Sequence, residues 1–448
     1  MTDDLRSIIA LGASAQAELL ASGAVSSRDL TAATLDAVEE AHQRLNATVA
    51  IFRDDALRAA DEADARRAAG DAGPLTGVPI AIKDDLDIAG HVTGWGSRSM
   101  IRPAETDSDY VRAVRDAGMV IVAKSALPEL AITGFTEPAA TGPTRNPHHL
   151  DHTPGGSSGG SGALVGAGAI GIASASDGAG SIRIPAACCG AVGFKPTNGH
   201  MPSSGGWHGL STQGCITPRL ADTALFLDTI GSFPDSFVEA AARAPEPLRI
   251  GLSFSGSAAT RPLPIDPRVR AAVQGTAERL EALGHDVREV TIPYGFAAKT
   301  LTARYLGGIR TSSMAVHDRS RLEKRTKGIA RLGAPFGRRA IAFAQRKGAE
   351  FGATIHDQLG VDVFLTPMMA GPPIPVGHWA DKGPVGLILS MNAFYAYTAQ
   401  WNHAGTPAVS LPAGTTDDGL PLAVQLIARR GDDARLMSLA AQVEAAGA

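Results

Sequence analysis

The sequence predicts an α/β fold, and three segments support this prediction. Residues 78–83 (VPIAIK) alternate large apolar side chains with small or polar ones, which is the period of a strand with one apolar face. Residues 106–128 begin as a helical stretch and pass through Gly118 into the apolar run 120–122. The pattern of residues 249–292 predicts a strand, a helix and a second strand, in that order. This alternation of strands and helices is typical of an α/β protein.

The elements follow one another from the N-terminus. Residues 5–70 predict alanine-rich amphipathic helices, with a break near Gly23 and a restart at Ser26. The spacing of Ser26 and Asp29 is that of a capping box at a helix start. Further elements are expected at 249–252 (strand), 267–283 (helix), 286–292 (strand) and 361–366 (a strand interrupted only by Asp362).

Two glycine-rich turns, each carrying a serine, lie between residues 154 and 197. The first turn, PGGSSGG, holds Ser157, and the second, DGAGS, ends at Ser181. Glycine allows positive φ angles and lets another group approach the backbone closely. Successive N–H groups in the second turn can converge on one point, as in an oxyanion hole. A close-packed structural turn is the alternative, but paired serine turns point to chemistry.

These turns resemble the amidase signature family of serine hydrolases. Ser181 follows Ser157 by 181 − 157 = 24 positions, the separation of the family's two catalytic serines. The resemblance also covers GVPIAIKDDLD (77–87), GPTRNP (142–147), HAGTPAVSLPAG (403–414) and GLPLAVQLIA (419–428). It implies a large mixed β-sheet covered by α-helices on both faces. It also implies hydrolysis of an amide, carbamate or ester, without a metal or other cofactor.

The resemblance assigns roles to particular residues. Lys83 matches the family's lysine and is expected to be buried and neutral, so that it acts as a general base. Ser157 is expected to relay a proton, and Ser181 to attack the carbonyl and form an acyl-enzyme. The expected oxyanion hole consists of the backbone N–H groups of Gly178, Ala179, Gly180 and Ser181.

Two details of these turns concern their backbone geometry. The family usually has two glycines directly before the nucleophile, whereas this chain has Ala179 and Gly180 there. If Ala179 adopted a positive φ, it would bear a steric cost that glycine avoids. The resemblance also implies a cis peptide bond between Gly156 and Ser157.

Other residues are weaker candidates for the chemistry. Lys124 and Lys195 lie outside the family's lysine motif, and His403 is expected to be structural because the family's base is a lysine. A cysteine nucleophile is the sharper alternative to Ser181, but no histidine motif of a cysteine hydrolase accompanies the cysteines. We expect small buried residues at Cys188, Cys189 and Cys215.

The histidines at positions 148, 149 and 152 could suggest a metal site. The sequence does not visibly supply the further ligands that such a site needs, so we expect a polar loop and no metal. The basic stretch 318–347 could similarly form a polyanion or membrane patch. Its interleaved apolar residues favour a solvated helical face instead.

Length and charge limit the remaining possibilities. The chain has 448 residues and a formal net charge of −4, which does not suggest a nucleic-acid partner. The first residues lack a leader pattern, and no apolar run is long enough to span a bilayer, so we expect a cytoplasmic protein. The sequence leaves open whether it forms a homodimer.

The motifs run from Lys83 to Gln425 and predict one domain over 1–448. Its parts are an N-terminal helical scaffold (1–70), the signature core (71–230), a variable substrate-reading region (235–380) and C-terminal core elements (381–448).

We expect an apolar wall of the substrate pocket after residue 367, and such a wall favours small neutral or aryl amides as substrates. Two alternatives to the amidase function remain. An amidotransferase-type subunit of a transfer-RNA-charging complex usually reads S-I-R-Q-P-A, where this chain has Ile184. A non-enzymatic nucleotide-binding module would be expected to carry a G-K-[ST] ending, which the serine turns lack. The wall candidates are Met368, Met369, Trp379, Phe394, Tyr395, Tyr397 and Trp401.

Overall fold

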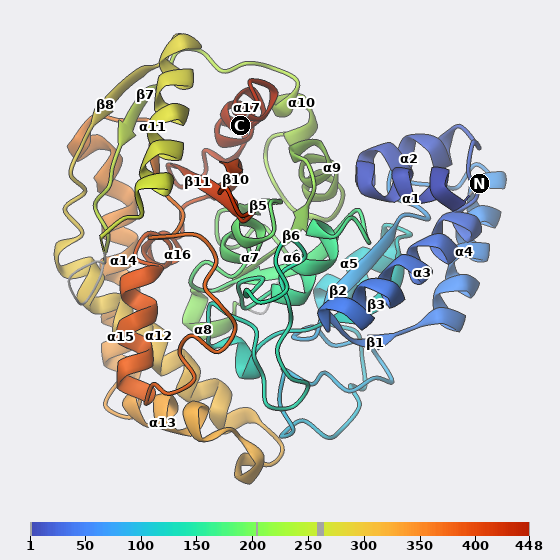
Figure 1. Cartoon of the computed structure of the whole chain (residues 1–448), viewed down its shortest axis with the longest axis horizontal. Helices are drawn as coiled ribbons and strands as arrows, with labels where there is room; N and C mark the ends of the chain where they lie inside the picture. The colour runs from blue at the N-terminus through green and yellow to red at the C-terminus, as the bar shows by residue number, and fades with distance from the viewer. Residues whose placement is uncertain (1, 203–204, 258–263, 448) are drawn as a thin grey trace.

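The computed structural model describes residues 2–202, 205–257 and 264–447, in which eleven strands form one sheet (Figure 1). Their order across the sheet is β1-β3-β2-β4-β6-β5-β10-β11-β9-β7-β8. The strands are β1 (Thr48–Ile51), β2 (Pro79–Lys83), β3 (Val120–Ser125), β4 (Ala173–Asp177), β5 (Val192–Lys195), β6 (Thr212–Thr217), β7 (Arg249–Leu252), β8 (Asp286–Glu289), β9 (Val363–Pro367), β10 (Ala408–Thr415) and β11 (Pro421–Ala428).

The sheet mixes parallel and antiparallel pairs. Strand β2 runs parallel to β3 and β4, and β7 runs parallel to β8 and β9. The central strands β6, β5, β10 and β11 pair antiparallel with their neighbours. The α/β prediction, with a mixed sheet between helices, is confirmed.

Seventeen α-helices are described in this part of the chain. Helices α1 to α4 gather beside β1 and β3, while α11 lies beside β7 and β8 at the other end of the sheet (Figure 1). The helices are α1 (Thr2–Leu11), α2 (Ala13–Ala21), α3 (Ser27–Leu45), α4 (Arg53–Ala68), α5 (Asp109–Asp116), α6 (Gly159–Gly166), α7 (Arg183–Cys188), α8 (Gly206–Gly209), α9 (Leu220–Ile230), α10 (Phe237–Ala241), α11 (Pro267–Ala282), α12 (Gly295–Ala315), α13 (Lys324–Leu332), α14 (Arg338–Leu359), α15 (Pro384–Phe394), α16 (Ala399–Ala404) and α17 (Asp433–Ala445).

The N-terminal segment requires one correction. Residues 5–70 contain helices as predicted, but β1 lies between α3 and α4 and pairs antiparallel with β3. Four residues in an alanine-rich context give too short a pattern to identify, and the strand exists because β3 supplies its partner. The predicted helix start at Ser26 is confirmed, since its side chain accepts a hydrogen bond from the Asp29 N–H at 2.9 Å.

The later elements follow the predicted order. The helix predicted at 267–283 is α11, and the strand predicted at 286–292 ends three residues earlier, at Glu289. The basic stretch 318–347 spans a 3-10 turn (Arg319–Arg321), α13 and the first half of α14. None of the helices in the described ranges is long and apolar enough to cross a membrane.

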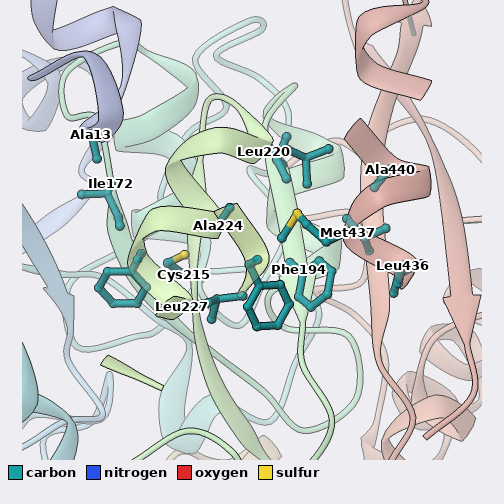
Figure 2. Close-up of a cluster of buried hydrophobic side chains, with 14 of the residues drawn as sticks. Ala13, Ile172, Phe194, Cys215, Leu220, Ala224, Leu227, Leu436, Met437 and Ala440 are labelled. Carbon is teal, nitrogen blue, oxygen red and sulfur yellow. The ribbon is translucent and has the colours of Figure 1, made fainter. Parts of the chain in front are cut away.

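Alternate residues of β2 show how helices cover both faces of the sheet. Ile80 and Ile82 belong to a core that includes α9 and α17, whereas Ala81 points into a second core with Leu164 of α6. Figure 2 shows part of the first core, in which Leu227 of α9 and Met437 of α17 lie near Phe194 of β5. This two-sided burial places the end of β2, and with it Lys83, inside the molecule.

Candidate active site

Four polar side chains meet at the end of β2. Lys83 is completely buried, and its Nζ lies 2.8 Å from Ser157 Oγ and 2.7 Å from Ser176 Oγ. Ser176 Oγ donates to Asp85 Oδ2 at 2.6 Å, and that oxygen is 3.4 Å from Lys83 Nζ. The sequence interpretation identified Lys83 and Ser157 but missed Ser176 and Asp85. The only available signal was their position in the sequence, since Asp85 lies inside GVPIAIKDDLD and Ser176 directly precedes DGAGS.

The backbone holds Lys83 and Ser157 in this arrangement. Strand β2 lies between β3 and β4, and the Lys83 N–H donates to Ser174 Oγ of β4 at 2.7 Å. The turn with Ser157 packs so closely that a Cβ on Gly156 would lie 2.8 Å from the Phe135 nitrogen. The peptide bond between Gly156 and Ser157 is cis, as the resemblance implies.

The hydrogen bonds define which way the protons point. A serine hydroxyl has a single proton, and that of Ser176 is donated to Asp85, so Ser176 accepts from Lys83. Burial lowers the pKa of Lys83 below its ordinary value, although the neighbouring carboxylate of Asp85 acts in the opposite direction. A neutral Lys83 can then direct its lone pair to the hydroxyl of Ser157.

The second serine turn is organised by Asp177. This buried carboxylate accepts hydrogen bonds from the N–H groups of Gly180 at 2.5 Å and Ile182 at 3.2 Å. It also forms a buried ion pair with Arg183, at 2.9 Å. Burial alone would raise the pKa of Asp177, but the charge and hydrogen bonds of Arg183 hold it well below its usual range. The turn before Ser181 is therefore anchored to an ionised carboxylate.

Arg183 connects this turn to the C-terminal motifs. Its guanidinium donates to Asn402 Oδ1 at 2.7 Å, to Gln425 Oε1 at 2.5 Å and to the Thr398 carbonyl at 3.2 Å. Asn402 precedes HAGTP and Gln425 lies in GLPLAVQLIA. Residues more than 200 positions apart in sequence thus contribute to one buried polar network.

The predicted oxyanion donors differ in their availability. Among the described residues, the N–H groups of Gly178, Ala179 and Ser181 have no hydrogen-bond acceptor, whereas that of Gly180 is bound to Asp177. Ala179 does not adopt a positive φ. Gly180 has φ 116°, and a Cβ there would lie 2.8 Å from Thr398 Cβ. The altered turn therefore keeps its glycine where the backbone requires one.

Two cavities meet at Ser181, whose exposed fraction is 9%. One, which we call the polar cavity, encloses about 340 Å³ and is also lined by Ser157, Ser176, Asp85 and Gly178. The other, the apolar cavity, is lined by Ala179 and by side chains of several separate segments. These include Ile132, Ile184, Trp207, Leu301, Tyr305, Leu306, Ile388, Met391 and Tyr395.

The structure places most of the expected wall residues elsewhere. Only Tyr395 among the seven lines a cavity at Ser181. Trp379 and Phe394 line a separate cavity, formed with the loop at 370–375. The other four are buried: Met368, Met369, Tyr397 and Trp401. Their apolar character reflects burial in the core, and side chains from α12 and α15 contribute instead to the wall next to Ser181.

The competing bases contact neither serine. Lys124 forms a buried ion pair with Asp84 at 2.8 Å, and Lys195 donates to the Pro196 carbonyl and to Asn198. His403 bonds to Arg304 and Thr300, and burial lowers its pKa to about 3.

The competing nucleophiles and ligands are no better placed. Burial raises the pKa of the thiols of Cys188, Cys189 and Cys215, which disfavours the thiolate. Within the described ranges, no three His, Cys, Asp or Glu side chains are grouped so that they could hold a metal ion.

Comparison with known proteins identifies relatives along almost the whole chain. A family model described as Amidase matches residues 29–437. AmiB2 of Mycobacterium tuberculosis, an amidase by name, is 42% identical over 446 residues, covering 97% of this chain and 96% of its own. A glutamyl-tRNA(Gln) amidotransferase subunit from a Synechococcus species is 36% identical, again with 97% and 96% coverage.

Solved structures agree with these relatives. A 6-aminohexanoate cyclic dimer hydrolase in complex with its substrate has a TM-score of 0.86 at 27% identity, over 97% of this chain and 96% of the other. A bacterial aryl acylamidase of the amidase signature family has the same TM-score at 26% identity, with the same coverage. The chain belongs to the amidase signature family of hydrolases.

Proposed function

We propose that this protein hydrolyses an amide bond through an acyl-enzyme on Ser181, with Lys83 and Ser157 as the proton relay. The observation that carries the proposal is the 2.8 Å contact between the buried Lys83 Nζ and Ser157 Oγ. Ser157 and Ser181 line the same cavity, which supports proton transfer between them. Burial favours the neutral amine that a general base requires.

The reaction begins when Ser181 Oγ attacks the substrate carbonyl. Its proton passes to Ser157, whose own proton passes to Lys83 and makes an ammonium ion. The oxyanion accepts hydrogen bonds from the free N–H groups of Gly178, Ala179 and Ser181. Gly180 contributes by holding the turn to Asp177.

Collapse of the tetrahedral intermediate breaks the carbon–nitrogen bond. The proton returns from Lys83 through Ser157 to the departing nitrogen, which leaves as a neutral amine. Water then attacks the acyl-enzyme by the same relay, releasing the carboxylic acid and restoring Ser181. No proton is gained or lost by the relay over one cycle.

The substrate class proposed is small neutral or aryl amides, with carbamates and esters as side substrates. The aromatic and aliphatic lining of the apolar cavity supports this choice. Similarity to an enzyme named as an aryl acylamidase gives further support. An apolar cavity discriminates between neighbouring homologues by only about 1–3 kcal/mol, so several related substrates should be accepted.

A second candidate function is that of an amidotransferase-type component of a larger complex, which 36% identity to such a protein supports. Ile184 argues against it, because those proteins usually carry glutamine at this position. Purified protein alone, assayed with anilides, primary amides, esters and aryl carbamates, separates the two. Turnover without a partner and in the presence of EDTA supports the amidase. Activity that requires added partner proteins supports the alternative.

A further inference from the structure

The two cavities that meet at Ser181 differ in the charge of their walls. Three aspartates, Asp85, Asp87 and Asp109, line the polar cavity, and the described residues around it include no Lys, Arg or His. The described lining of the apolar cavity contains no Asp, Glu, Lys, Arg or His. A substrate that spans Ser181 therefore encounters a neutral wall on one side and an acidic wall on the other.

The position of Ser157 decides which part of the substrate occupies each cavity. In the proposed reaction the departing nitrogen takes its proton from Ser157. Ser157 lines the polar cavity and does not line the apolar one. The leaving group must therefore lie in the polar cavity, which leaves the apolar cavity to the acyl group.

The aspartates of the polar cavity are not fully neutralised by the protein. Asp85 is nine-tenths buried; its Oδ2 contacts Ser176 and Lys83, and only its Oδ1 has no hydrogen-bond partner among the described residues. The exposed side chain of Asp87 forms no ion pair or hydrogen bond in the same part of the chain, whereas Asp109 pairs with Arg112. The unpartnered oxygen of Asp85 and the free carboxylate of Asp87, which lines the same cavity as Ser181, favour a cationic ligand there.

We propose that the preferred substrates are amides of amines that carry a second, positively charged amino group, acylated with a neutral apolar acid. This proposal rests on the proposed amidase function and narrows its substrate class: the acyl group stays neutral, and the leaving amine carries the charge. In such a substrate the aryl or alkyl acyl group fills the apolar cavity. The ammonium group of the leaving amine lies near Asp87, while the scissile nitrogen faces Ser157.

The test uses substrates matched in shape. N-(3-aminopropyl)phenylacetamide differs from N-butylphenylacetamide only by an ammonium in place of the terminal methyl group. At low ionic strength we expect kcat/KM for the cationic leaving group to be about twofold to fivefold higher, as an exposed ion pair allows. The ratio should decrease as salt is added. An ammonium on the acyl side, as in N-butyl-4-(aminomethyl)phenylacetamide, should lower kcat/KM instead.

Asp87→Asn should reduce the ratio of the two leaving groups toward one. Asp116→Asn removes the same charge from an exposed position at the end of α5 that lines neither cavity, and should leave the ratio unchanged. A ratio of one or below in the unsubstituted enzyme would overturn this inference while leaving the amidase function intact. Failure to hydrolyse any of the three amides would count against the proposed function itself.

Discussion

Ser176 Oγ donates its single proton to Asp85 Oδ2 at 2.6 Å while accepting from Lys83 Nζ at 2.7 Å. This contact links a carboxylate to the proposed base, although neither Ser176 nor Asp85 belongs to the family's catalytic set as read from the sequence. Asp85 favours the ammonium form of Lys83, and burial disfavours it. The balance between the two determines the pH at which Lys83 becomes a base.

Activity should rise from acid toward mildly alkaline pH as Lys83 loses its proton. Asp85→Asn should change the pH at which this rise occurs. Because Asp85 raises the pKa of Lys83, its loss lowers that pKa and shifts the acid limb of kcat/KM to lower pH. The plateau should also fall, because the ammonium formed during acylation loses its counter-charge. The pH profile of kcat/KM measures both effects.

Asp116→Asn is the matched control for this experiment. It removes an exposed charge, and the Asp116 side chain forms no ion pair or hydrogen bond in the described part of the chain. Its profile should coincide with that of the unsubstituted enzyme. An acid limb of Asp85→Asn at unchanged or higher pH would show that another group sets the profile.

Substitution of the three relay residues should give strongly non-additive effects. Ser181→Ala, Ser157→Ala and Lys83→Ala should each lower kcat on the order of 10⁴-fold or more, because each interrupts the same proton path. Double variants should be scarcely worse than the worse single variant. Kinetics on folded variants, verified by circular dichroism, provide the measurement. Losses that multiply would contradict a shared relay.

The two serine turns and Lys83 could be singled out from the sequence because each lies in a compact local motif. The contact between Lys83 and Ser157 joins residues 74 positions apart, and only the family resemblance could anticipate it. The cavity wall was beyond this kind of inference. Ile388 and Met391 of α15, and Tyr395 directly after it, line the apolar cavity, whereas Phe394 lines a separate cavity with Trp379. Composition alone cannot distinguish these neighbouring positions.

Two methionines test whether the apolar cavity binds the acyl group. Met391 lines the apolar cavity and Met369 lies in the core, and both are buried. Each Met→Ala change should cost about 2–5 kcal/mol of unfolding free energy. Only Met391→Ala should change the relative kcat/KM of phenylacetyl and acetyl anilides, by about tenfold. Unaltered acyl preference in Met391→Ala would place the acyl group elsewhere.

Arg183→Met should destabilise the protein strongly. It leaves Asp177 buried without its cation and removes the bonds to Asn402 and Gln425, so we expect a loss of about 3–5 kcal/mol in unfolding free energy. Urea titration measures it. Arg249→Met breaks an ion pair with Asp362 at the surface and should have a much smaller effect. Equal midpoints for the two variants would contradict a structural role of the buried network.

The most direct measurement is the location of the covalent intermediate. A fluorophosphonate, or a slowly released aryl carbamate, should add one adduct per chain, and peptide mass spectrometry should locate it on Ser181. Ser181→Ala should take up no label. An adduct on Ser157, Cys188 or Cys215, or labelling that persists in Ser181→Ala, would contradict the assignment of Ser181 as the nucleophile.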